Sequence, residues 1–181
     1  DSIGESLIKE IFPRIPISLV ENPYFNDILK ELSAIDIPIT ENSNDISALY
    51  VCEPLSEHAK IQYGDARYWG YVEEDALRFF LDNILSLGHS YQRIILRPHP
   101  SENKSKYSWV YDEYDLPIEF SGNHSLLEDI ARSNLVAGCQ STAMVVGIMA
   151  GKRVISCIPE NGAACGLPQK DIEHLQDIVS D

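Results

Sequence analysis

The chain has 181 residues, of which 44% are hydrophobic and 23% are charged. This composition is typical of a globular protein with a hydrophobic core and excludes a disordered chain. The 28 Asp and Glu residues outnumber the 14 Lys and Arg residues, which gives a formal net charge of −14. Without an excess of cations, binding to duplex DNA or another extended polyanion is not expected, although a small local phosphate site is compatible with this charge.

The cysteine pattern and the hydropathy of the sequence indicate in which cellular compartment the protein is expected. The four cysteines, at positions 52, 139, 157 and 165, form neither a CxxC pair nor a dense disulfide framework, so we expect reduced, structural thiols. No spacing of His and Cys is typical of a metal site, and we expect no metal and no cofactor. Because no apolar run could span a bilayer and no signal peptide is apparent, we expect a cytoplasmic protein, free or peripheral to the inner face of the membrane. Because the sequence starts at Asp1 rather than Met, we expect it to be a piece of a longer protein.

Residues 1–45 differ in pattern from the rest of the chain. We expect an amphipathic helix over 3–12, a short strand over 17–20, a helix over 24–32 and a polar break over 41–45. This stretch is too short for a domain, and we interpret it as an interdomain or N-terminal linking segment. The domain itself then occupies residues 46–181.

Within residues 46–181, short apolar runs alternate with amphipathic stretches. The predicted strands cover 48–52, 93–96, 118–120, 135–137 and 154–158, and the predicted helices cover 70–88, 126–132, 143–150 and the helix-like end at 171–181. Such alternation predicts the α/β class: a doubly wound, mostly parallel sheet with helices on both faces. Ligands of these sheets bind at the carboxyl ends of the strands, so the loops at 53–58, 97–102, 121–125 and 138–142 are candidate site segments.

The loop after the second predicted strand contains Arg97, Pro98, His99 and Pro100. Two prolines fix the backbone around the histidine, so aiming its imidazole costs little entropy. A histidine at this place can donate to phosphate oxygens and stabilise a departing anionic group. The alternative is a proline-rich turn with an exposed histidine, and we favour the functional interpretation.

The loop after the fourth predicted strand is GCQST, which ends in Gln140, Ser141 and Thr142. Hydroxyl groups and unpaired N–H groups at the start of a helix are suited to binding phosphate. A plain helix N-cap explains the same residues, since Ser and Thr are preferred there. Neither a P-loop, a GxSxG elbow nor a GxGxxG fingerprint occurs, which disfavours a hydrolase and a dinucleotide-binding fold.

Two further loops carry polar residues with open interpretations. Asn123 or Ser125 can cap the helix at 126–132, with Glu128 completing a capping box, or Glu128 can hold ribose hydroxyls. Glu53 and His58 follow the first strand and lie either in a loop without ligand or at the mouth of the site.

His99-Pro100 and Ser141-Thr142, each after a predicted strand, resemble the C-terminal, donor-binding half of a glycosyltransferase-B enzyme. More narrowly, they are similar to motifs of the bacterial sialyltransferases and polysialyltransferases, which pair a His-Pro motif with a later Ser-Ser or Ser-Thr motif. The resemblance implies a Rossmann-like domain in which both motifs contact a CMP-sugar donor, chiefly its phosphate, and His99 has a catalytic role. Residues 126–159 are also similar to CDP-glycerol glycerophosphotransferases and nucleotide-sugar 2-epimerases.

The resemblance also implies that the catalytic base lies outside this sequence. The base of this family is an acidic residue in an Asp/Glu-Asp/Glu-Gly motif of the N-terminal domain, and no such motif occurs in this sequence. The chain would then be one half of an inverting glycosyltransferase of polysaccharide biosynthesis, with a nucleotide-sugar donor and a glycan acceptor as partners. An alternative from another class is a non-catalytic α/β module that assembles with a partner protein through the apolar helix at 143–150.

Overall fold

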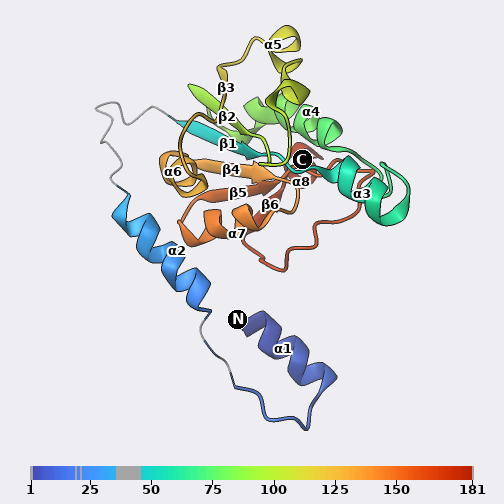
Figure 1. Ribbon diagram of the computed structural model, residues 1–181, viewed down its shortest axis with the longest axis vertical. Coiled ribbons are helices and arrows are strands. Elements are labelled where there is room, and N and C mark those ends of the chain that lie inside the picture. The colour runs from blue at the N-terminus through green and yellow to red at the C-terminus, as the bar shows by residue number, and fades with distance from the viewer. Residues whose placement is uncertain (1, 19, 21, 36–45, 181) are drawn as a thin grey trace.

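Six parallel strands form the centre of the molecule (Figure 1). The computed structural model describes residues 2–18, 20, 22–35 and 46–180. The strand order is β3-β2-β1-β4-β5-β6, and every neighbouring pair is parallel. This is the order of a Rossmann-like sheet, so the predicted doubly wound α/β class is confirmed. The strands are β1 (Ser47–Val51), β2 (Arg93–Arg97), β3 (Ile118–Phe120), β4 (Leu135–Gly138), β5 (Arg153–Ser156) and β6 (Ile172–His174).

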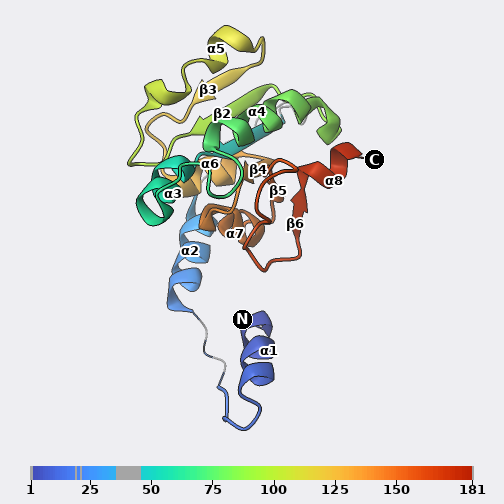
Figure 2. The ribbon, with the colours of Figure 1, turned by 90° about the vertical axis from the view of Figure 1, so that its right-hand side faces the viewer.

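Helices cover both faces of the sheet, as Figures 1 and 2 show from two directions. The helices of the described residues are α1 (Ser2–Ile11), which lies apart from the sheet, α2 (Pro23–Ala34), α3 (Leu55–Tyr63), α4 (Glu73–Asn83), α5 (Val110–Glu113), α6 (Leu126–Arg132), α7 (Thr142–Met149) and α8 (Leu175–Ser180). Two 3-10 helices, η1 (Ile84–Leu87) and η2 (Lys104–Tyr107), complete the described elements.

The alternation of side chains along β1 divides the interior into two cores. Ala48 and Tyr50 pack in the core formed with α4, η1 and α8, whereas Leu49 and Val51 pack in the core formed with α2, α6 and α7. All five residues of β1 are buried, as expected for a central strand covered on both faces. Burying one large apolar side chain such as Phe80 contributes about 1.5–3 kcal/mol, so these two cores hold the sheet together.

The described part of residues 1–45 contains the two predicted helices but not the predicted strand. Asn22 is the N-cap of helix α2, and its Oδ1 accepts the N–H of Tyr24 at 3.1 Å. The helix packs on α6, and its Ile28 is buried in the same core. Both views show α1 lying apart from the sheet. The predicted strand at 17–20 is wrong for its described residues, which are irregular; residue 19 and the predicted break at 41–45 lie outside the described residues.

Two other segments differ from the sequence-based expectation. Residues 53–58 were predicted as a loop, but α3 begins at Leu55 because Leu55 and Ala59 reach buried positions one turn apart; Gly64, at φ 78°, ends the helix. The C-terminal stretch, predicted to be helical, first forms β6, whose Ile172 is buried, before α8 begins.

Three of the four cysteines are buried, and all four are free thiols, as predicted. Within the described part of the chain, no helix has the length and apolarity needed to cross a membrane. The division of the chain into a linking segment over residues 1–45 and a domain over residues 46–181 remains a prediction.

Candidate anion-binding site

The sheet order places the carboxyl ends of β1, β2 and β4 next to one another. Beside them lies a pocket of about 240 Å³, at the point where the strand order reverses and Rossmann-like sheets bind ligands. Its lining brings together five of the residues predicted from the sequence and five others: Arg97, His99, Pro100, Ser141 and Thr142, with Val51, Cys52, Pro98, Leu126 and Ala143.

The turn that follows β2 fixes the imidazole of His99. The backbone N–H of Ser101 donates to its Nδ1 at 3.2 Å, and the Ser101 hydroxyl lies 2.7 Å from the same atom. Because Nδ1 accepts a hydrogen bond, the neutral ring carries its proton on Nε2. His99 therefore offers an Nε2–H donor, which is what an anionic ligand requires.

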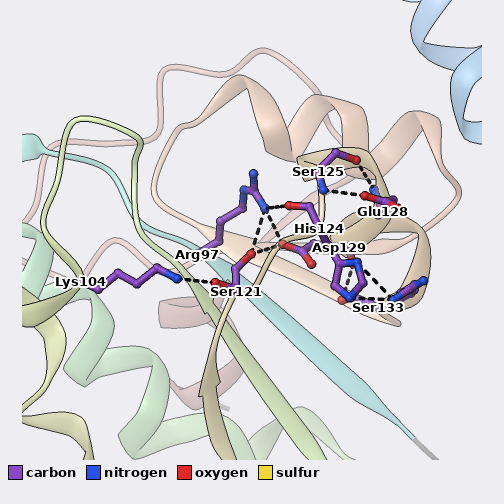
Figure 3. Close-up of polar contacts among 9 residues, drawn as sticks. Arg97, Lys104, Ser121, His124, Ser125, Glu128, Asp129 and Ser133 are labelled. Carbon is purple, nitrogen blue, oxygen red and sulfur yellow. Dashed lines mark hydrogen bonds and ion pairs between the residues drawn. The ribbon is translucent and has the colours of Figure 1, made fainter.

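Arg97, the last residue of β2, is held on one nitrogen by a buried carboxylate (Figure 3). Its Nη1 donates to Oδ2 of Asp129 at 2.6 Å, to the hydroxyl of Ser121 at 3.0 Å and to the carbonyl of His124 at 3.0 Å. The side chain of Asp129 is only 2% exposed and also accepts from the Ser121 hydroxyl at 2.6 Å. Among the described residues, Nε and Nη2 of Arg97 have no hydrogen-bond acceptor, so this fixed cation retains donors for a ligand.

The two hydroxyls of the loop after β4 have different surroundings. Ser141 is the N-cap of α7, and its Oγ accepts the N–H of Ala143 at 3.2 Å. Thr142 is the first residue of the helix and is exposed at the pocket. The hydroxyl of Ser141 is thus used to cap the helix, while that of Thr142 lies where it can contact a ligand.

A carboxylate of the protein already occupies part of this loop. Oε1 of Glu53 accepts the backbone N–H groups of Cys139 at 2.8 Å and Gln140 at 3.0 Å. The expectation of unpaired N–H groups is therefore wrong for these two residues. Burial raises the pKa of the Glu53 carboxyl above its usual value, although these N–H groups act in the opposite direction.

Four of the predicted site residues lie outside the lining of this pocket. Ser125 and Glu128 form a reciprocal capping box at the start of α6, with bonds of 2.6 and 3.2 Å, as Figure 3 shows. Both line a different cavity, of about 430 Å³, between α2 and α6. Gln140 accepts the N–H of Gly166 at 3.3 Å, and Asn123 is exposed.

Sequence analysis missed Asp129 and left Glu53 undecided. Asp129 shares its helix with Glu128 and has no distinguishing neighbour in the sequence. The position of Glu53, two residues after β1 at the reversal of strand order, is the one sequence signal that could have identified a polar partner for the loop after β4.

The pocket gathers positive charge and hydrogen-bond donors in an acidic protein. The pocket is lined by Arg97, His99, Thr142 and the first turn of α7. Such donors, at the positive end of a helix dipole, suit a small anion rather than a cation. Within the described residues, no group of three or more His, Cys, Asp or Glu side chains could hold a metal ion. The fold and the site thus define a Rossmann-like α/β domain with a pocket suited to phosphate.

No protein-family model matches the chain, and no curated protein does. Among solved structures, the chain is similar to KpsC of Thermosulfurimonas dismutans, a beta Kdo 2,4 transferase, with 16% sequence identity and a TM-score of 0.46. The similar region covers 86% of this chain and 50% of that one. The chain therefore spans about half the length of that structure.

Proposed function

We propose that this chain is the donor-binding domain of a glycosyltransferase-B enzyme and that its pocket holds the phosphate of a nucleotide-sugar. The observation that carries the proposal is the convergence of His99-Pro100 and Ser141-Thr142, which are about forty residues apart, on one pocket. The motif pattern makes a CMP-activated sugar, as used by sialyltransferases, the specific donor that we propose.

The donors of the pocket match the charge that develops in such a reaction. As the bond between the sugar and the phosphate breaks, the leaving nucleotide gains negative charge. Nε2–H of His99, the guanidinium of Arg97 and the hydroxyl of Thr142 would stabilise that charge without a metal ion. The acceptor hydroxyl must lose a proton, and we assign its base to a part of the enzyme outside this chain.

The size of the pocket limits what it holds by itself. Its volume of about 240 Å³ lies below the roughly 300–1,000 Å³ typical of sites that enclose a drug-sized ligand. It suits a phosphate with the adjoining part of a nucleotide, and the sugar would extend out of it. The domain is therefore expected to bind the nucleotide more weakly than a complete enzyme.

Calorimetric titration tests this proposal. We expect saturable binding of CMP and CDP, weaker binding of inorganic phosphate, and no binding of cytidine at the same concentrations. His99→Ala should weaken CMP binding by about 1–3 kcal/mol, the range for a hydrogen bond to a charged group. His89→Ala is the matched control, because His89 is exposed in the loop that precedes β2, at the opposite edge of the sheet. Absence of saturable binding of all three phosphate compounds at millimolar concentration contradicts the proposal.

Of the two observations behind the assembly alternative, the apolar segment at 143–150 has an explanation within the fold, while the lack of the acidic motif still stands. The apolar segment at 143–150 is α7, and it packs on the sheet with Ala143, Met144 and Val146 buried. Gly147 lies so close to Val136 and Val154 that an added Cβ would come within 3.2 Å of both. The apolar character of this helix is explained by the core rather than by a partner protein.

A further inference from the structure

We propose that Glu102 is a positioning residue: it closes the turn that carries His99 and so keeps the imidazole Nε2–H available to an anionic ligand. This inference rests on the proposed function, since the ligand contact of His99 belongs to it. Glu102 lies in the same turn as His99 but is not part of the pocket lining.

Glu102 and His99 hold each other in a reciprocal arrangement. Oε2 of Glu102 accepts the backbone N–H of His99 at 3.2 Å, while the backbone N–H of Glu102 donates to the carbonyl of His99 at 2.8 Å. The first of these bonds, from a backbone N–H to a carboxylate three residues later, also occurs in the capping box at the start of a helix. The carboxylate thus fixes the backbone on which the imidazole is mounted.

The fixed turn determines which ring nitrogen is occupied. Ser101, between His99 and Glu102 in the turn, donates its N–H to Nδ1 of the ring at 3.2 Å. If the turn opened, Ser101 would move away from Nδ1, and the ring would rotate and exchange its tautomers. Glu102 therefore acts on the imidazole through the position of Ser101.

A buried charge network holds Glu102 in place. Its side chain has no exposed surface, and Oε1 accepts the Tyr107 hydroxyl at 2.9 Å and Nζ of Lys106 at 2.7 Å. Lys106 also forms an ion pair with Glu73, whose carboxylate accepts the N–H and the hydroxyl of Ser56 at 2.8 and 2.6 Å. The carboxylates raise the pKa of Lys106, against the opposing effect of its own burial. The turn after β2 is thereby anchored to the first turns of α3 and α4.

The cost of burying Glu102 supports a role beyond filling space. A carboxylate without exposed surface is unfavourable unless its oxygens are fully hydrogen-bonded, and an apolar side chain of similar volume would often be at least as stable. Both oxygens of Glu102 are satisfied, one by the network and the other by the N–H of His99. An apolar residue at position 102 would leave the N–H of His99 without this acceptor.

A double-mutant cycle of Glu102→Gln and His99→Ala, with CMP affinity measured by calorimetry, tests the inference. In Glu102→Gln the amide oxygen can accept from Lys106 and Tyr107, which leaves the NH2 group facing the N–H of His99 and opens the turn. We expect CMP to bind about fivefold more weakly to Glu102→Gln, and less than twofold more weakly when the same change is made in His99→Ala. Glu102→Asp keeps the charge but is too short to reach His99, so it should show the same losses of CMP affinity. It replaces Glu102→Gln in the cycle if that variant does not fold.

A second readout needs no ligand. Nitrogen-15 spectra of the neutral His99 ring should show the Nε2–H tautomer with a hydrogen-bonded Nδ1 in the parent, and a mixture of tautomers in Glu102→Gln. Leu87→Ala, which opens a cavity in the core within η1, is the control for lost stability and should leave both readouts unchanged.

The two readouts separate the possible failures. Equal losses of CMP affinity in both backgrounds, or an unchanged His99 spectrum together with unchanged affinity in Glu102→Gln, overturn the role of Glu102 while the proposed function stands. If the parent binds no CMP, the proposed function fails, and the His99 spectrum alone then decides whether Glu102 holds the ring.

Discussion

Ser141 and Thr142 are adjacent, yet we expect Ser141→Ala to lose stability and Thr142→Ala to lose affinity for CMP. Ser141→Ala removes the hydroxyl that caps α7 by accepting the N–H of Ala143 at 3.2 Å. Losing such an N-cap costs about 1 kcal/mol of stability. In a chain of 181 residues this lowers the melting temperature by about 2–4 °C. The affinity for CMP should change less than in Thr142→Ala, since the cap bond holds the Ser141 oxygen at the start of the helix.

Thr142→Ala should lower the affinity for CMP more than it lowers the stability of the fold. The side chain is exposed and forms no cap, so its removal should change stability by less than about 0.5 kcal/mol. If the hydroxyl donates to the donor phosphate, CMP affinity falls about fivefold, equivalent to about 1 kcal/mol. Thr142→Ser retains the hydroxyl and is the matched control, with affinity close to that of the parent.

The assay is a thermal melt and a CMP titration for each variant, and the decisive quantity is the ratio of the two effects at each position. A double variant should combine both losses. The reasoning is refuted if Ser141→Ala loses affinity while Thr142→Ala does not, or if both variants and the double variant bind CMP like the parent.

Two other predictions concern the carboxylates next to the pocket. Asp129→Ala should lower the free energy of unfolding by about 3 kcal/mol in urea titrations, at the lower end for a broken buried ion pair because the Arg97 side chain is 23% exposed; a loss below about 1 kcal/mol would show that the pair is not formed. For Glu53, whose folded pKa is raised by burial, the native state binds the extra proton, so stability should decrease as pH rises from its usual pKa of 4.5 through the raised value. Glu53→Gln should lack this pH dependence, and identical pH profiles of parent and variant would contradict the assignment.

The sequence was sufficient to predict the strands β1 to β5 of the sheet and the meeting of two motifs. Strand patterns are local, and parallel strands place their carboxyl ends at one edge, so His99 and Thr142 could be expected on one side of the sheet. It was also sufficient to identify the capping box of Ser125 and Glu128, because its residues are three apart. Helix α3 and strand β6 were missed because burial of Leu55 and Ile172 depends on neighbours distant in the chain.

The electrostatic partners of the site could not be predicted from local patterns. Glu53 reaches the N–H of Cys139 across 86 residues, and Asp129 reaches Arg97 across 32. Both contacts depend on which strands are neighbours and on the register between them. Glu102 is close to His99 in sequence, but an acid near a proline turn is common, and only its complete burial and its bond to the His99 N–H distinguish it.

The position of bound nucleotide is the most direct test of the central claim. Backbone amide shifts recorded during a CMP titration report where on the domain the ligand binds. The account predicts saturable shifts at His99, Thr142 and their neighbours, with the largest changes in the loops after β2 and β4. Shifts confined to Ser125 and Glu128, at the larger cavity between α2 and α6, or no saturable shifts at millimolar CMP, would contradict it.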